Sequence, residues 1–329
     1  MDEGRGVWEL ADLVTPMSIR VAATLRVADH LAVGRSTAEI ASIEHVDADA
    51  LDRLLGHLVT AGVLRRVEGG GYASTPAGAE LRSDHPAGLR NVLDIEGPLG
   101  RAELSLVELL RSVASADAGF PMRYGRTFWE DLSDDAGRAT AYAERMGEDV
   151  ARWAPAIVAG FDWNSLGSIV DVGGGDGSLS LALLRAFPGL RATVLDMPTT
   201  AERARVNVAE AGLADRCDVV EGSFFEPLPA GADGYVLSAI LHDWNDEDAR
   251  AILARCADAA AGGGSILAIE KIGPDGESVR TAMDLRMLAY FGGRERGVAA
   301  IGALAADVGL GTRSVHPSGD LVIVELDVP

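Results

Sequence analysis

The sequence predicts a doubly wound α/β protein with a seven-stranded sheet that ends in an antiparallel hairpin, preceded by a smaller helical domain. An apolar strand at 168–172 runs into glycines 173–177 and then into a helix that starts at Ser178, which is how a βαβ unit begins. Strands and helices then alternate to the end of the chain. The last two strands are separated only by 317–320, which is too short for a crossover helix, so they must pair antiparallel.

The first 98 residues predict a separate, mostly helical domain. Its expected elements are helices at 7–34, 37–43 and 47–61 and strands at 63–67 and 72–74. Asp47 is the expected N-cap of the third helix and Gly62 its stop. This winged-helix pattern serves either DNA binding or dimerisation. Because Asp47, Asp49 and Asp52 on the would-be recognition helix repel phosphate, dimerisation is favoured.

Residues 99–329 form the predicted second domain, whose sheet region starts at about 160. The loop-rich segment 86–98 marks the boundary before it. The order predicted from spacing is an amphipathic helix at 101–113, a loop at 114–125 and a long helix at 138–160. Beyond these we expect strands at 168–172, 191–196, 217–221, 234–240, 264–270, 312–317 and 320–326, and helices at 178–187, 199–212, 246–261 and 296–309.

Composition narrows the class of protein. The chain has 329 residues, 48% of them apolar, and a formal net charge of −21, which argues against nucleic-acid and anionic-membrane partners. It lacks an 18-residue apolar run, and four acidic residues within its first twenty argue against a secretory signal. Two cysteines, Cys217 and Cys256, have no metal-binding or disulfide spacing. A cytoplasmic enzyme without a metal is the expectation.

The glycine-rich turn predicts a nucleoside-containing cofactor. Glycines let the backbone approach a ligand, and the following helix directs its free N–H groups there. Asp196 ends the second strand, where an acidic residue accepts hydrogen bonds from a ribose diol. Ser178 takes the third glycine position of a dinucleotide fingerprint, which counts against a nicotinamide dehydrogenase. Phe224 and Phe225, after the third strand, could sandwich an adenine.

Three titratable residues are expected at the same rim of the sheet, because ligands bind outside the carboxyl ends of its strands. These are His242, Glu270 and Glu295. A histidine beside a carboxylate is oriented and made more basic. The chain has no serine or cysteine at a nucleophile elbow and no phosphate-loop lysine, so the cofactor must supply the reactive group. A sulfonium methyl donor fits, with a phenol as acceptor.

Each of these residues also has a structural interpretation. His242 can be a capping or core histidine, since Asp243 and Asp246 open the next helix. Glu270 and Glu295, taken singly, can be surface carboxylates. Their convergence at the predicted rim favours the catalytic interpretation.

Five motifs occur in the order and spacing of one family. They are Asp171–Gly177, Leu195–Pro198, Gly222–Phe225, Leu241–Trp244 and Gly292–Arg296. Over essentially its whole length the chain resembles the S-adenosylmethionine-dependent O-methyltransferases of the caffeate and hydroxyindole type, especially bacterial members that methylate aromatic polyketides, including hydroxynaphthoates, in antibiotic pathways. The resemblance implies the Rossmann-like class I methyltransferase fold, a homodimer formed by a winged-helix-like amino-terminal domain, and S-adenosyl-L-homocysteine as the product of the cofactor.

The resemblance also implies roles for individual residues. His242 is the expected general base, bracketed by Glu270 and Glu295, with Asp243 beside it. The expected cofactor-binding residues are Asp171, Gly173, Gly175, Asp196, Met197, Ser223, Phe224, Ser238 and Trp244. The expected substrate residues are Trp129, Met146, Met283, Met287 and Tyr290. Ser223 and Ser238 replace the aspartate and the lysine that are usual in the family, so a different cofactor contact is expected there.

The sequence thus predicts an O-methyltransferase that acts on a polyketide-derived phenol or hydroxyaryl acid. Arg20 or Arg26 could meet a substrate carboxylate, although an ordinary surface arginine is the favoured interpretation of each. Three rivals stay open: a family member repurposed for hydroxylation or decarboxylation, a nicotinamide dehydrogenase, and a winged-helix regulator that senses a ligand. The sequence does not fix the acceptor, the position methylated or the pathway.

Overall fold

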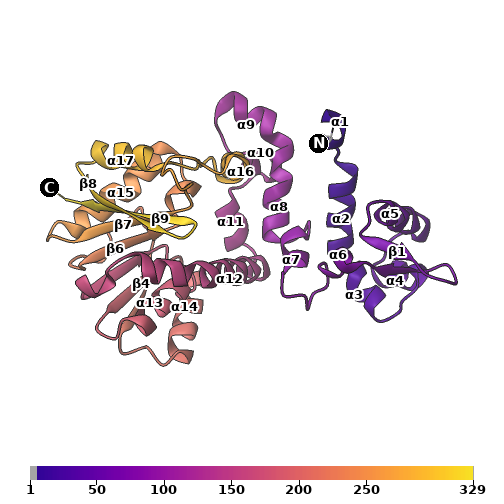
Figure 1. Cartoon of the computed structure of the whole chain (residues 1–329), viewed down its shortest axis with the longest axis horizontal. Helices are drawn as coiled ribbons and strands as arrows, with labels where there is room; N and C mark the ends of the chain where they lie inside the picture. The colour runs from indigo at the N-terminus through magenta and orange to yellow at the C-terminus, as the bar shows by residue number, and fades with distance from the viewer. Residues whose placement is uncertain (1–5, 329) are drawn as a thin grey trace. The chain divides into compact units, whose positions relative to one another are not determined.

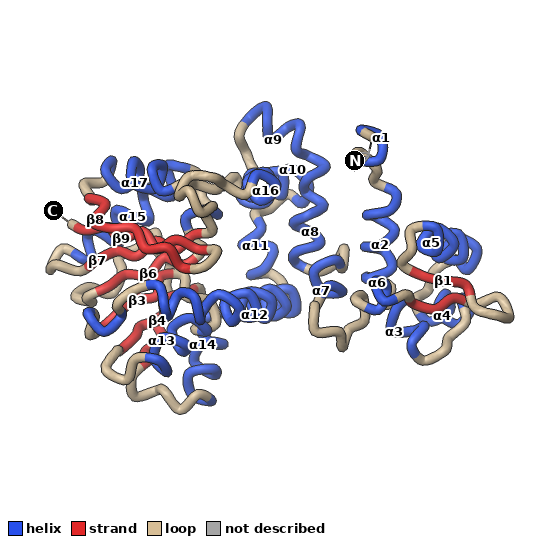
Figure 2. Tube along the Cα trace, viewed as in Figure 1, coloured by secondary structure: helices blue, strands red, loops and turns tan. Residues whose placement is uncertain are grey.

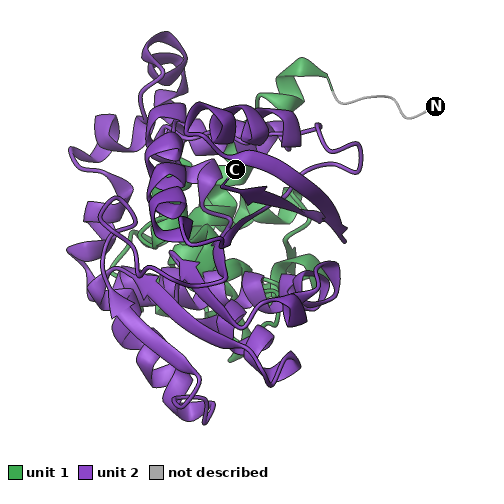
Figure 3. Cartoon of the chain, turned by 90° about the vertical axis from the view of Figure 1, so that its left-hand side faces the viewer, with its two compact units in different colours: residues 1–104 green, residues 105–329 purple. Residues whose placement is uncertain are grey.

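The chain divides into two compact units, which separate after Leu104 (Figure 3). The structure is a computed structural model and describes residues 6–328. The division lies a few residues beyond the boundary that the sequence predicts after residue 98.

The first unit is built from helices around one small apolar core, with a two-stranded sheet. Its elements are α1 (Val7–Leu10), α2 (Val14–Thr24), α3 (Val27–Ala32), α4 (Thr37–Ile43), α5 (Ala48–Thr60), β1 (Leu64–Arg66), β2 (Tyr72–Ser74), α6 (Pro76–Ala79), α7 (Leu89–Leu93) and α8 (Pro98–Leu104). Asp47 caps α5 by accepting a hydrogen bond from the Ala50 N–H at 2.8 Å, and β1 pairs antiparallel with β2, as predicted. The long helix expected at 7–34 is three helices, because Asp12 caps a new start at Val14 and Arg26 adopts a left-handed φ of 49°.

The second unit contains a three-layer α/β fold preceded by further helices (Figures 1 and 2). Before the sheet come the 3-10 turn η1 (Ser105–Glu108), α9 (Leu109–Ser115), α10 (Gly119–Tyr124), α11 (Phe128–Ser133), α12 (Ala136–Gly160) and the turn η2 (Trp163–Ser165). The sheet region comprises β3 (Ser168–Val172), α13 (Ser178–Ala186), β4 (Arg191–Asp196), α14 (Pro198–Glu210), β5 (Cys217–Glu221), β6 (Gly234–Ser238), η3 (Leu241–Asp243), α15 (Asp246–Ala260), β7 (Ser265–Glu270), α16 (Thr281–Phe291), α17 (Val298–Asp307), β8 (Gly311–Ser318) and β9 (Leu321–Asp327).

The strands lie in the order β5-β4-β3-β6-β7-β9-β8, which confirms the predicted seven-stranded sheet. The first five are mutually parallel, whereas β9 runs antiparallel to both β7 and β8. Alternate strand residues face opposite layers: α15 and α17 pack on the face that includes Val170 and Val172, and α12, α13 and α14 pack on the face that includes Ile169. The inner strands β3, β6, β7 and β9 are buried on both faces and are mostly apolar, whereas the edge strands β5 and β8 are largely exposed.

Three parts of the second unit differ from the sequence prediction. The helix expected at 101–113 is interrupted by η1, and the loop expected at 114–125 contains α10. The segment 283–296, which is not among the helices expected from the sequence, is mostly α16. The residue before α16, Arg280, makes no side-chain capping bond, so the usual start signal is missing, whereas the helix does end at Gly292 with a φ of 77°.

The topology fixes where a ligand site can lie. From β3 the chain builds β4 and β5 on one side, then returns to place β6 and β7 on the other. The loops after β3 and β6 therefore diverge at the carboxyl edge of the sheet, which is the switch point where doubly wound sheets bind ligands.

Candidate active site

The glycine turn after β3 adopts a backbone conformation that depends on glycine. Gly173, Gly175 and Gly177 have φ values of 72°, 61° and 82°, a region that strongly favours glycine. A Cβ on Gly173 would lie 2.7 Å from Ile240 Cδ1 and 3.3 Å from Phe224 Cε1. Two apolar side chains thus stand directly against the turn. Asp171 lies just before it and is buried, with its carboxylate accepting the Ser180 hydroxyl at 2.7 Å.

Asp196 connects the ends of β3 and β4. One carboxylate oxygen accepts the Gly175 N–H and the other accepts the Met197 N–H, both at 2.8 Å. Burial raises the pKa of Asp196 in spite of these bonds. Each oxygen has a further lone pair, so the carboxylate can still accept hydrogen bonds from two hydroxyls.

The loops after β5 and β6 place aromatic side chains beside the glycine turn. Trp244 packs edge-to-face on Phe224 and Phe225, with ring centroids 5.6 and 4.8 Å apart. Ser223 accepts the Phe225 N–H at 3.2 Å, and Ser238 ends β6 at the same rim. The structure therefore brings together the predicted cofactor residues from the ends of four strands, β3, β4, β5 and β6.

His242 lies on η3, immediately beyond β6, within reach of three carboxylates. Its Nδ1 is 3.2 Å from Glu270 Oε2 and 3.6 Å from Glu295 Oε1, while its Nε2 is 3.3 Å from Asp243 Oδ1. The Glu270, Glu295 and Asp243 side chains are 5%, 3% and 11% exposed, whereas that of His242 is 21% exposed. The predicted catalytic cluster is therefore assembled, with its histidine on the open side.

The shape of the backbone explains how the histidine reaches this position. Ala239 follows β6 with a φ of 55°, an uncommon conformation for a residue with a side chain, and this turns the chain into η3. Glu270, at the end of the neighbouring strand β7, accepts the Leu241 N–H at 3.0 Å. One carboxylate thus holds both the backbone of η3 and its histidine.

The electrostatics of the cluster favour retention of protons. Burial alone would lower the pKa of His242, but the negative charges of Glu270, Asp243 and Glu295 outweigh it and raise the pKa to about 10. Burial, together with repulsion from the two glutamates, raises the pKa of Asp243 to about 7, and burial, together with repulsion from Glu295, raises the pKa of Glu270. Because the sites interact strongly, protons belong to the cluster as a whole.

A continuous group of aromatic rings leads away from this cluster. Trp244 stacks on Trp129 at 6.4 Å, and Trp129 stacks on Phe291 at 5.2 Å with the ring planes 18° apart. Tyr142 of α12 packs edge-to-face on Trp129 at 6.0 Å. Flat apolar surfaces from α11, α12 and α16 thus lie next to the loop that carries His242.

The predicted substrate residues lie on these same helices. Met146 is on α12, Trp129 on α11, and Met283, Met287 and Tyr290 are on α16. Met287 and Tyr290 are buried, with exposed fractions of 5% and 7%. Contact with a ligand stays a prediction for each of them.

The two candidate carboxylate-binding arginines both have acidic partners in the first unit. Arg20 lies 3.3 Å from Glu103, and Arg26 lies 3.2 Å from Asp29. Arg20 also has a buried guanidinium nitrogen with no hydrogen-bond partner among the described residues. Arg20 therefore retains a buried donor for a ligand, whereas Arg26 pairs through its Nε and its side chain is 56% exposed.

Sequence reasoning missed four residues of this region. Ile240 flanks the glycine turn. Tyr142 is buried near Asp243 and Asp196, and burial together with their negative charges raises the pKa of its hydroxyl well above the usual value. Asp284 accepts the Glu295 N–H at 2.9 Å, and Arg296 donates to the backbone on both sides of His242. Of these four, only Arg296 could have been found from the sequence, because it belongs to the motif Gly292–Arg296. The motif does not reveal which atoms its side chain contacts.

Two family profiles match most of the chain. The profile described as O-methyltransferase domain matches residues 106–311, and the one described as O-methyltransferase dimerisation domain matches residues 8–84. Separately, none of the helices within residues 6–328 is long and apolar enough to span a membrane.

Characterised relatives match over nearly the full length. The chain is 51% identical to a 2,7-dihydroxy-5-methyl-1-naphthoate 7-O-methyltransferase of Streptomyces carzinostaticus, over 98% of this chain and 97% of the relative. It is 41% identical to the aclacinomycin 10-hydroxylase RdmB of Streptomyces purpurascens, over 95% and 86%. A crystal structure of NcsB1, an O-methyltransferase from neocarzinostatin biosynthesis in complex with S-adenosylmethionine and 2-hydroxy-5-methyl naphthoic acid, superposes with a TM-score of 0.93 at 49% identity, over 99% of this chain and 100% of that one.

Proposed function

The chain belongs to the S-adenosylmethionine-dependent O-methyltransferase family, and from that premise we propose that it methylates a hydroxyl group of an aromatic acceptor with His242 as the general base. The observation that carries the proposal is the position of His242. It stands on the open side of three carboxylates, at the switch point of the sheet and beside the glycine turn.

The residues around the switch point fit S-adenosylmethionine. Asp196 has lone pairs free for a ribose diol, and Gly173 and Gly175 leave room for close approach. Phe224, Ile240 and Trp244 provide apolar surface for an adenine. When bound, the cofactor supplies an electrophilic methyl group on a positively charged sulfur.

His242 must lose its proton before it can accept one. With a pKa of about 10, its imidazole is protonated in the ligand-free enzyme at neutral pH. The pKa of the His242 imidazole would fall if a positively charged ligand bound nearby, because the two positive charges repel each other. The His242 side chain is 21% exposed, so this proton can leave toward solvent on the open side of the cluster. His242 then takes the proton of a phenol as the new bond to the acceptor oxygen forms.

The acceptor we propose is a polyketide-derived hydroxyaryl acid such as a hydroxynaphthoate, used in secondary metabolism. The aromatic group formed by Trp129, Trp244 and Phe291 supports a flat, apolar acceptor. The relative at 51% identity is named for methylation of a dihydroxynaphthoate, which supports the same class.

We also propose that the enzyme is a homodimer. The dimerisation profile covers residues 8–84, and the start of the chain carries exposed apolar side chains, with Trp8 89% and Leu13 71% exposed. Several large exposed apolar side chains within one short segment are typical of an interaction site. That the enzyme works in the cytoplasm stays a prediction from the sequence.

The test is incubation of the protein with methyl-labelled S-adenosylmethionine and a panel of phenols that includes 2,7-dihydroxy-5-methyl-1-naphthoate. Transfer of label to a hydroxyl, together with calorimetric binding of S-adenosylhomocysteine and none of NADH, is the expected result. The relative named as a hydroxylase makes a repurposed site the second candidate. Tight cofactor binding with an oxygenated but unlabelled product would establish it, and binding of NADH alone would refute both.

A further inference from the structure

We propose that Arg296 is a positioning residue, whose buried guanidinium locks the loop that carries His242 against the loop that carries Glu295. This inference rests on the proposed role of His242 as the base. It concerns a side chain that is outside the predicted catalytic, cofactor and substrate sets.

The guanidinium holds the backbone on both sides of the histidine. Arg296 Nη1 donates to the Leu241 carbonyl at 2.6 Å, and Nη2 donates to the Trp244 carbonyl at 2.8 Å. These carbonyls belong to the first residue of η3 and the residue that follows its last, so the two bonds bracket His242. Bidentate contact of this kind uses the planar fork of arginine, which a lysine cannot reproduce.

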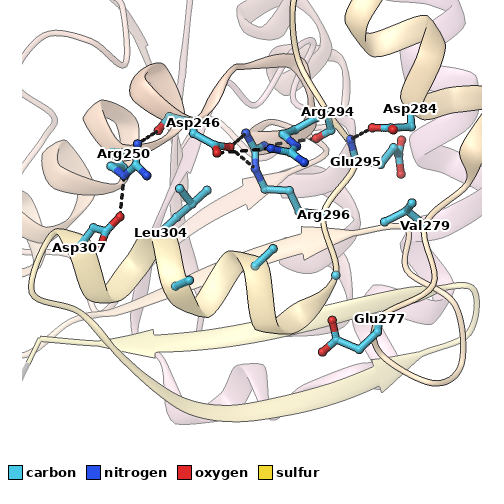
Figure 4. A pocket seen from close by; sticks show the side chains of 13 residues that line it. Asp246, Arg250, Glu277, Val279, Asp284, Arg294, Glu295, Arg296, Leu304 and Asp307 are labelled. Carbon is cyan, nitrogen blue, oxygen red and sulfur yellow. Dashed lines mark hydrogen bonds and ion pairs between the residues drawn. The ribbon is translucent and has the colours of Figure 1, made fainter.

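The same side chain is fixed on its other edge. Asp246 Oδ1, at the start of α15, accepts from Arg296 Nη2 at 2.7 Å and from Nε at 3.2 Å. Nη1 also reaches the Arg294 carbonyl at 3.3 Å, so the guanidinium contacts η3, α15 and its own loop. Figure 4 shows Arg296 between Asp246 and Arg294 in the wall of a 460 Å³ cleft.

The two loops are packed as closely as backbone allows. A Cβ on Gly293 would lie 2.3 Å from the His242 carbonyl oxygen, so only glycine fits there. The Arg294 N–H donates to that same oxygen at 2.9 Å. Glu295, between Arg294 and Arg296, is thereby presented to His242, with its Oε1 3.6 Å from His242 Nδ1.

The burial of Arg296 indicates that its charge has a role beyond packing. The Arg296 side chain is 3% exposed, and desolvation lowers its pKa although Asp246 favours its charge. A buried ion pair adds little stability compared with apolar packing of the same volume. We therefore infer that the Arg296–Asp246 pair serves to fix the geometry of the loop that carries His242. Arg250 lines the same cleft and is a useful contrast. It is 40% exposed, and among residues 6–328 its hydrogen-bond partners are Asp307 and the Asp246 carbonyl, neither of which belongs to η3.

The test compares Arg296→Ala and Arg296→Lys with two controls, Arg250→Ala and Leu304→Ala. Leu304 lines the same cleft and is 4% exposed, so its truncation destabilises the fold without touching the histidine loop. For each variant we would measure kcat and KM with labelled S-adenosylmethionine and 2,7-dihydroxy-5-methyl-1-naphthoate, the Kd for S-adenosylhomocysteine, the pH dependence of kcat, and Tm.

We expect Arg296→Ala to lower kcat by about 10- to 100-fold, because a misplaced catalytic group costs about that much, while Kd changes less than about threefold. The acidic limb of the pH profile should move to higher pH, because the lost cation no longer opposes protonation of His242 among Asp243, Glu270 and Glu295. Arg296→Lys should retain the position of that limb but recover only part of kcat. Both controls should keep the wild-type pH limb, with kcat within about twofold at temperatures well below Tm.

The proposal is overturned if Arg296→Ala changes Tm alone and leaves kcat and the pH limb where Leu304→Ala leaves them. If Arg296→Ala does not fold, the variants Arg296→Lys and Asp246→Asn test the proposal instead. A loss of kcat of at least about fivefold, with the Kd for S-adenosylhomocysteine retained, supports the proposal. Wild-type kcat in both variants refutes it. Failure of the proposed function would look different, because His242→Ala itself would then keep its methyl-transfer rate.

Discussion

Two histidines of the second unit lie among acidic residues, but within residues 6–328 an arginine pairs directly with the carboxylate beside only one of them, His316. At the edge of the sheet, Glu325 accepts the Ser314 hydroxyl at 2.5 Å and the Ser265 hydroxyl at 3.2 Å, and it also pairs with Arg313 at 3.3 Å and His316 at 3.3 Å. At the switch point, His242 is the one base among Glu270, Glu295 and Asp243.

This difference separates a structural cluster from a reactive one. Burial tends to raise the pKa of Glu325, but hydrogen bonds from Ser314, His316 and Ser265 outweigh it and lower the pKa. Around His242, burial first and repulsion between neighbouring acids second raise the pKa of Asp243 and that of Glu270 instead. Perturbation by burial and like charges inside a ligand site is typical of catalytic groups. The following predictions test this distinction, in order of expected effect.

The two histidines should differ most in activity. His242→Ala should reduce kcat for methyl transfer by about 10²- to 10⁴-fold, the usual contribution of a general base. His316→Ala should leave kcat within about twofold, because it removes no reacting group. Steady-state assays with labelled S-adenosylmethionine measure both, and equal losses would erase the distinction between the clusters.

Substitution of Glu270 should change the activity and its pH dependence, whereas substitution of Glu325 should not. Glu270→Gln removes a negative charge that raises the pKa of His242, so kcat should fall about 10- to 100-fold and its acidic limb should move to lower pH. Glu325→Gln should leave the pH profile unchanged. A Glu270→Gln profile that coincides with wild type would contradict the electrostatic role given to this carboxylate.

Stability at high pH should improve when Asp243 is neutralised. Its folded pKa of about 7 exceeds the ordinary 3.8, so stability falls as pH rises from about 4 to 7, where only the unfolded chain has released the proton. Asp243→Asn should therefore raise the free energy of unfolding by about 2 kcal/mol at pH 8 and by little at pH 4. Urea unfolding at the two pH values measures this, and a larger gain at pH 4 would reverse the expected sign.

Glu325→Gln should show the opposite pH dependence with a smaller effect. Because its folded pKa is lowered, the carboxylate stabilises the fold above its unfolded pKa, and this stabilisation is lost as pH falls through the folded pKa. The variant should lose about 1 kcal/mol at pH 7 and approach wild type at low pH. The same urea titrations would refute the sign if the loss grew on acidification.

The sheet and the identity of the rim residues were predictable because their signals are local. Alternating strands and helices, the glycines at 173–177 and the short hairpin connection each follow from neighbouring residues. The helix α16 was missed because Arg280 provides no capping side chain, and the helix is held by the burial of Met287 and Tyr290. Tertiary packing there overrides weak local preference.

The support of the site could not be predicted, since it depends on contacts across long sequence separations. Arg296 reaches the Leu241 carbonyl and Glu270 the Leu241 N–H. Ile240 meets Gly173 only because β6 lies beside β3. The sequence motifs identify residues of the site, but the fold determines which atoms these residues contact.

We expect the buried carboxylates of Glu270, Glu295 and Asp243 to keep His242 protonated until a cationic methyl donor binds. Carbon-13 NMR titration of the His242 Cε1 signal, assigned with His242→Ala, tests it in the free protein and with S-adenosylmethionine or uncharged-sulfur S-adenosylhomocysteine bound. The expected result is a pKa near 10 in the free protein and a clearly lower pKa with S-adenosylmethionine than with S-adenosylhomocysteine. A free-protein pKa near the ordinary value of about 6.5, or the same pKa with both ligands, would contradict the claim.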